Sequence, residues 1–220
     1  MNQRLALPVC TTYLSTFAIR HTEAQDDAFF TDITEAVGLD FEHEPGTEGN
    51  YWAPEVMGSG GAFFDFDGDG DLDIYLIQGG SLPESKSTKR LPNRLFRQND
   101  DGSFEDVTEN AGVGDTGYGM GFAVGDIDGD GRLDIVTAAR ESRLLLFLGS
   151  TNGFTEHSIP LPDEFRYGKG VAIGDIDGDR QPDLVMANRG DPKKRAVSWI
   201  SYRDSPTSGK WTTTRISDAA

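Results

Sequence analysis

Short runs of mostly apolar or alternating residues recur along the chain, each bounded by Gly, Asp, Asn or Pro. Examples are NRLFRQ from Asn93, RLLLFLGS from Arg143 and AVSWISYR from Ala196. Runs of about four to eight residues with such boundaries are typical of β-strands. The chain holds 27 glycines and lacks alanine-rich helical stretches. The pattern therefore predicts an all-β fold of short strands and many turns.

One unit occurs three times: MGSGGAFFDFDGDGDLDIYLI from Met57, YGMGFAVGDIDGDGRLDIVTA from Tyr118 and YGKGVAIGDIDGDRQPDLVMA from Tyr167. Small residues align between the units, namely Gly58, Gly119 and Gly168, Gly60, Gly121 and Gly170, and Ala62, Ala123 and Ala172. A stretch of Gly and Ala is typical of a strand that packs closely against neighbouring strands. An aspartate-rich loop follows it in every unit, and then a second strand such as DIVTA.

A second element repeats between these units. FTDITEAVGL from Phe30 matches FEDVTENAGV from Phe104, with weaker echoes from Phe154 and Trp211. A period of roughly 50 residues with four short strands is typical of a β-propeller blade. The small-residue strand would be the inner strand and the Phe-x-Asp-x-Thr element an outer one. We expect three to four blades of a partial propeller; a β-sandwich or a solenoid of hairpins is the alternative.

The loops place carboxylates at positions 1, 3, 5 and 9, a spacing that can surround one cation. The residue at position 7 would add its backbone carbonyl. The expected metal ligands are Asp65, Asp67, Asp69, Asp71 and Asp73 in the first loop, Asp126, Asp128, Asp130, Arg132 and Asp134 in the second, and Asp175, Asp177, Asp179, Gln181 and Asp183 in the third. Ca²⁺ takes six to eight hard oxygen ligands in a forgiving geometry, whereas Mg²⁺ demands a stricter one and Zn²⁺ favours His or Cys. We therefore expect about three Ca²⁺ ions in strand–loop–strand sites.

Position 6 is a glycine in two loops, Gly70 and Gly131, and Arg180 in the third. Glycine allows a sharp turn through positive φ, which costs another residue on the order of 1 kcal/mol. The third site should bind calcium most weakly. An EF-hand is excluded because it requires Glu at position 12, where Leu76 and Thr137 stand here, and flanking helices. Asp-Gly loops are also good turns without metal, but all three loops have their four acidic positions filled.

Charge and cysteine content narrow the classes of function. The net charge is −17 with a pI near 4.4, which argues against nucleic acid and anionic membrane surfaces as partners. A single cysteine, Cys10, excludes an intrachain disulfide and multi-cysteine zinc sites.

Residues 1–26 resemble a weak signal peptide or a disordered lead-in, and residues 27–220 form the repeat region. No stretch is long and apolar enough for a membrane span. We expect the protein to be secreted, periplasmic or on the cell surface.

The GDIDGDGRLDI units resemble FG-GAP/VCBS repeats, which also form the blades of integrin α-subunit propellers. The stretch from NRLFRQNDDGSFEDVTENAGV to DIDGDGRLDI is similar to bacterial relatives of cartilage acidic protein, the ASPIC/UnbV type. This resemblance covers residues 29–215 and implies an exported β-propeller with Ca²⁺ in blade loops and a role in adhesion or binding. Complete propellers of this kind usually have seven blades. The chain is thus expected to be a fragment, a half-propeller that forms a homodimer to complete a ring, or a compact four-bladed ring.

No motif for catalysis is evident. A Gly-x-Ser-x-Gly elbow is missing, and an aspartate loop rather than a helix follows GYGMGFAVG, which argues against a dinucleotide site. We expect a calcium-stabilised binding or adhesion module, not an enzyme, with a protein or glycan partner. Tyr51 and Trp52 are the candidates for ligand contact because they have no counterpart in the other units. The alternatives are a polysaccharide-active enzyme domain and a purely structural segment of a longer protein.

Overall fold

The computed structural model describes residues 30–48, 55–56, 58–81, 89–139, 143–161, 168–188 and 196–218. The chain divides into two compact units, Met1–Asp32 and Ile33–Ala220, and the sheets described below all belong to the second. The expected signal peptide at residues 1–26 and the proposed contact residues Tyr51 and Trp52 lie outside the described residues.

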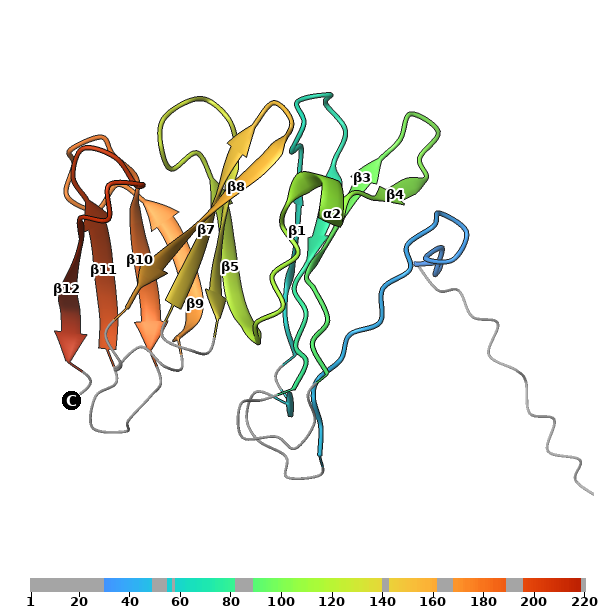
Figure 1. Ribbon diagram of the computed structural model, residues 1–220, viewed down its shortest axis with the longest axis horizontal. Helices are drawn as coiled ribbons and strands as arrows, with labels where there is room; N and C mark the ends of the chain where they lie inside the picture. Colours follow the sequence, from blue (N-terminus) through green and yellow to red (C-terminus); the bar gives the residue numbers. More distant parts are fainter. Residues whose placement is uncertain are drawn as a thin grey trace, which may run out of the picture. The chain divides into compact units, whose positions relative to one another are not determined.

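The described residues of the second unit include three four-stranded antiparallel sheets (Figure 1). The first sheet contains β1 (Gly61–Phe64), β2 (Asp73–Leu76), β3 (Arg94–Gln98) and β4 (Phe104–Asp106). The second contains β5 (Gly119–Gly125), β6 (Asp134–Ala139), β7 (Arg143–Ser150) and β8 (Gly153–Pro160), and the third β9 (Gly168–Gly174), β10 (Asp183–Asn188), β11 (Ala196–Tyr202) and β12 (Trp211–Asp218). Strands neighbour one another in chain order within every sheet. This confirms the prediction of an all-β fold of propeller-type blades.

Hydrophobic residues fill the space between consecutive sheets. One cluster joins the first and second sheets and includes Tyr75, Leu95 and Phe147. The other joins the second and third sheets and includes Val136, Leu146 and Leu184. Side chains of a strand alternate between its two faces, so the second sheet contributes Ile135 to the first cluster and Val136 to the other.

The small-residue strands come first in their sheets and contact one another, β1 with β5 and β5 with β9. Their glycines permit this close approach. A Cβ added at Gly125 would lie 3.1 Å from Cδ1 of Ile173 in β9. A Cβ at Gly60 would lie 2.9 Å from the Phe122 ring in β5. The prediction that these strands lie where blades crowd together is therefore confirmed.

The Phe-x-Asp-x-Thr element behaves differently in its two copies. Phe104–Asp106 forms β4 and leads into the one-turn helix α2 (Thr108–Ala111). The matching segment from Phe30 forms no strand, and residues 34–38 form a turn. Its expected outer strand is absent from the described residues because no described strand pairs with it there, and an isolated strand is not stable in water. The turns still correspond, since Gly38 and Gly112 both have positive φ, 82° and 74°.

Candidate metal centres

Each aspartate-rich loop connects the first two strands of its sheet, and Figure 1 shows these connections at the same end of the three sheets. The carboxylate at position 1 organises the loop by accepting backbone N–H groups. In the second loop, Asp126 accepts from Gly129 at 2.8 Å through Oδ1 and from Gly131 at 2.9 Å through Oδ2. Asp65 and Asp175 make the corresponding bonds in the other loops. The repeated sequence therefore folds into the same turn three times.

Position 6 has the backbone conformation expected from its glycines. Gly70 and Gly131 have φ values of 95° and 87°. Arg180, which replaces glycine in the third loop, is also in the left-handed region at φ 72°. The prediction that a side chain is forced into positive φ at this position is confirmed, and the strain it carries belongs to the third loop alone.

The carboxylate at position 9 is buried in all three loops: Asp73, Asp134 and Asp183 are 0%, 0% and 3% exposed. Asp134 accepts from the N–H of Ile127 at 2.7 Å and from that of Gly149 at 2.8 Å. Asp73 makes the equivalent bonds with Phe66 and Gln98, both 2.9 Å. In the first and second sheets the position 9 carboxylate thus ties the loop to the third strand, a role that sequence reasoning missed.

Ligand atoms from positions 1, 3 and 9 converge in every loop. The groups are Asp65, Asp67 and Asp73, then Asp126, Asp128 and Asp134, then Asp175, Asp177 and Asp183, and the carboxylate oxygens of each group lie within 4.8 Å of one another. Two oxygens bound to one Ca²⁺ at 2.3–2.6 Å are separated by at most about 5 Å. The oxygen-only donor set and its spacing therefore fit Ca²⁺.

The residues at loop positions 5 and 7 make contacts that differ from those at positions 1, 3 and 9. Asp130 pairs with the guanidinium of Arg132, whose Nε donates to the carbonyl of Gly149 at 3.1 Å. Asp69 and Asp179 accept from the N–H groups of Asp71 and Gln181, both at 2.8 Å. The position 5 carboxylates do not belong to the three convergent groups. Their coordination of metal, and that of the carbonyls of Asp71, Arg132 and Gln181, stays a prediction.

Burial and mutual repulsion act on the converging carboxylates. Burial is the main cause that raises the pKa of Asp134 to about 6, and the charges of Asp128 and Asp126 add to it. Burial likewise raises the pKa of Asp73, with smaller contributions from Asp67 and Asp69. Burial, followed by the charge of Asp130, raises the pKa of Asp128. A divalent cation would relieve this cost because it favours the ionised carboxylates.

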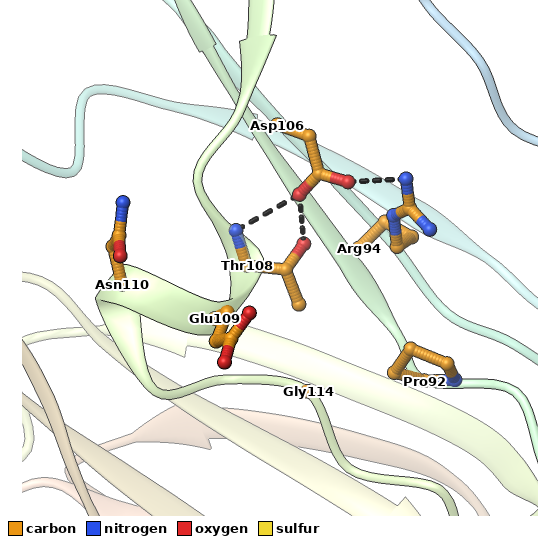
Figure 2. Close-up of a pocket in the computed structure, with 7 residues that line it drawn as sticks. All are labelled: Pro92, Arg94, Asp106, Thr108, Glu109, Asn110 and Gly114. Carbon is orange, nitrogen blue, oxygen red and sulfur yellow. Dashed lines mark hydrogen bonds and ion pairs between the residues drawn. The ribbon is translucent and has the colours of Figure 1, made fainter.

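A separate pocket of about 540 Å³ lies beside α2 (Figure 2). It is lined by Pro92, Arg94, Asp106, Thr108, Glu109, Asn110 and Gly114. Both oxygens of Asp106 are engaged, one by Arg94 and the other by the N–H and hydroxyl of Thr108. Glu109 adds a carboxylate and Asn110 an amide to the lining, and these groups suit a small polar ligand. No motif in the sequence indicates this pocket, because its lining comes from two separate segments around β3 and α2.

A model of the FG-GAP-like repeat matches the chain twice, at residues 65–137 and 128–186. The two matches together span more than half of the 220 residues. The chain therefore belongs to the FG-GAP-like repeat family, which confirms the resemblance to FG-GAP repeats. The likeness to the ASPIC/UnbV type stays a prediction. A search of curated proteins found no match.

Repeats of this family are generally non-enzymatic and occur in extracellular and cell-surface proteins. Within the described residues, no helix has the length and apolar character required to cross a membrane.

Proposed function

We propose that this protein is a calcium-binding propeller module that acts outside the cytoplasm, secreted, periplasmic or on the cell surface, by binding a protein or glycan. The observation that carries the proposal is the threefold recurrence of three converging carboxylates at equivalent positions of a family repeat. One acidic Asp-Gly loop can be a stable turn and nothing more. Three loops with matching hydrogen bonds to the position 1 carboxylate and the same convergence favour a common ligand, and Ca²⁺ is the cation whose ligand preference they match.

The role of calcium in this proposal is structural. Each loop joins two strands, and in the first two loops the position 9 carboxylate also holds the third strand. Without metal, the converging carboxylates repel one another and weaken these connections. Bound Ca²⁺ would remove the repulsion, so that part of the binding free energy becomes folding free energy. The loops would then hold the blades while other surfaces bind the partner.

A polysaccharide-active enzyme is the alternative, and the pocket beside α2 does not favour it. Asp106 is held by Arg94 and Thr108, and Glu109 is the one other carboxylate in the lining. Glycoside hydrolysis generally needs two free carboxylates on either side of the scissile bond. The pocket suits recognition of a polar group better than its hydrolysis.

An array of polysaccharides and surface proteins would test the binding role. The full chain is applied with millimolar Ca²⁺ and, in parallel, with chelator. The proposal predicts retention on a subset of spots in calcium, with loss in chelator and no release of reducing sugar. Glu109→Gln is a matched probe of the pocket, with Glu105→Gln on exposed β4 surface as its control. Retention on no spot in calcium, or release of sugar, would contradict the proposal.

A further inference from the structure

The outer face of the third sheet repeats a face that is buried elsewhere in the chain. In the second sheet, Val136, Ala138, Leu144 and Leu146 point toward the third sheet and are 0% exposed. Val136 pairs with Leu146 across strands β6 and β7, and Val185 pairs with Trp199 across the corresponding strands β10 and β11. The residues of the third sheet that correspond to this buried face are therefore Val185, Ala187, Val197 and Trp199. These four residues point away from the second sheet. We call them the terminal face.

The terminal face has no covering sheet among the described residues. Val185, Val197 and Trp199 are half-buried, Ala187 is exposed, and neither hydrophobic cluster includes any of them. The indole Nε1 of Trp199 is shielded from solvent and has no hydrogen-bond partner in the described part of the chain. A shielded N–H without an acceptor destabilises the protein because its hydrogen bond to water is lost and not replaced. The face therefore has the apolar character and the unpaired donor of an interface.

The contact between the second and third sheets shows which kind of side chain packs against a face of this type. Ile173 of β9 lies against Gly125 of β5, and its Cβ is 3.8 Å from the Cβ position of that glycine. Gly174 is the counterpart of Gly125 in the third sheet, directly before its aspartate loop. A Cβ at Gly174 would have no described atom within 4 Å. The space that Ile173 occupies beside Gly125 is therefore unoccupied beside Gly174 in the described part of the chain.

The matching side chain is present at the other end of the same chain. Phe63 precedes Asp65 by two residues, as Ile173 precedes Asp175. It is 71% exposed, although it sits beside Ile74 on a face where Ile74 and Phe96 are buried. Arg94 lies over the Phe96 ring, so part of this face is already covered. Phe63 is left as a large exposed apolar side chain on an inner strand.

We propose that a second copy of this chain docks on the terminal face, with its Phe63 in the space beside Gly174. A second copy is the occupant because one chain carries both complementary halves, and their spacing from the aspartate loops repeats the Gly125–Ile173 contact. A head-to-tail contact of this kind closes when the second copy's terminal face takes the Phe63 of the first. The described sheets of two copies number six, within the usual range of four to eight propeller blades.

The negative charge of both copies makes this association depend on salt and on divalent cations. Each copy has a net charge of −17, and both Phe63 and Gly174 lie next to an aspartate loop. Docking therefore brings two acidic loops toward each other. Salt or bound divalent cations should favour the dimer, since they screen or neutralise these charges.

Disulfide trapping tests the contact in the full chain with Cys10→Ser as background. Phe63→Cys and Gly174→Cys are made in separate chains and mixed under oxidising conditions with Ca²⁺. A Cβ separation near 3.8 Å is well suited to a disulfide, so the mixture should give a covalent dimer and neither variant alone should. Gly125→Cys with Ile173→Cys in one chain is the positive control for oxidation. Phe63→Cys mixed with Thr207→Cys, at an exposed loop position, measures random cross-linking.

A second variant keeps the test independent of cysteine chemistry. A Cβ at position 174 has no described atom within 4 Å. Gly174→Leu should therefore leave the melting temperature within a few degrees of the wild type and abolish dimer in native mass spectrometry. Wild-type protein that stays monomeric across the micromolar range in calcium, with a Phe63–Gly174 cross-link no stronger than the Thr207 control, would overturn the proposal. In a chain that retains Cys10, a disulfide between Cys10 and Gly174→Cys would place the chain's own N-terminal segment on this face and would overturn the proposal as well.

Discussion

The carboxylate of Asp134 accepts a hydrogen bond from the backbone N–H of Gly149, 2.8 Å away, and so joins an aspartate loop to the third strand of its sheet. Its other oxygen accepts from Ile127 at 2.7 Å. Both bonds are made by the protein alone. The position 9 aspartate therefore has a structural role with and without metal, whereas position 3 is exposed and would serve mainly the metal.

We expect Asp134→Asn to destabilise the protein in calcium and in chelator alike. One side of the new amide would present N–H donors to a backbone N–H, which leaves a buried donor unpaired at a cost of about 1–3 kcal/mol. Thermal unfolding in both conditions measures the effect. A loss confined to calcium would show that Asp134 acts as a ligand only and that its backbone bonds contribute little.

Asp128→Ala should behave in the opposite way. Asp128 is exposed and belongs to the converging group of the second loop. Its removal should lower the melting temperature in millimolar Ca²⁺ and have much less effect in chelator, where it even relieves repulsion with Asp126 and Asp130. Asp100→Ala, an exposed carboxylate in the β3–β4 connection, is the control. Equal losses in both conditions would mean that the loop is a turn and not a metal site.

Arg180→Gly should stabilise the third loop. Arg180 has φ 72°, which a glycine adopts without steric cost, so the folded state should gain up to about 1 kcal/mol, reduced by the greater freedom of glycine in the unfolded chain. Calcium affinity of the third site should rise as well. Calorimetric titration of the variant against wild type measures the change. Gly131→Arg is the reciprocal variant, and a weaker second site is the expected result; unchanged affinities in both variants would contradict the strain argument.

Stability in chelator should increase as pH falls from 7 toward 5. The pKa of Asp134 is raised to about 6 in the folded protein, from an ordinary value of 3.8. Between these values the folded state binds more protons than the unfolded state, so the free energy of unfolding falls as pH rises through this window. Saturating Ca²⁺ should reverse the trend, because protons then compete with the metal. Unfolding at several pH values, with and without calcium, is the measurement. Asp134→Ala should flatten the slope in chelator, and an unchanged slope would assign it to other groups.

The repeat pattern was sufficient to predict most of the fold. Alternation and Gly-rich segments identified the strands, since β5 and β9 coincide with GFAVG and GVAIG and β4 with FED. The missing glycine at Arg180 also predicted the strained backbone, because position in the repeat fixes φ. Such features follow from local sequence and can be read from it.

Features that depend on distant partners could not be read in this way. Phe30 repeats the sequence around Phe104 but forms no strand, because strand formation needs a neighbour to pair with. The bond from Gly149 to Asp134 joins residues 15 positions apart through a backbone N–H, which carries no side-chain signature. The pocket beside α2 is likewise formed by two segments that pairing of β3 with β4 brings together.

Native mass spectrometry of the full chain tests the calcium sites most directly. The protein is sprayed after exchange into buffer with calcium and again after chelation, alongside a variant with Asp67, Asp128 and Asp177 all changed to Ala. The wild type should bind three Ca²⁺ per chain, and the ion of the third loop, which contains Arg180, should be lost first as calcium is lowered. The triple variant should bind none at the same concentration. A wild-type chain that folds with no bound calcium, and that melts at the same temperature in chelator, would show that the aspartate loops are not structural calcium sites.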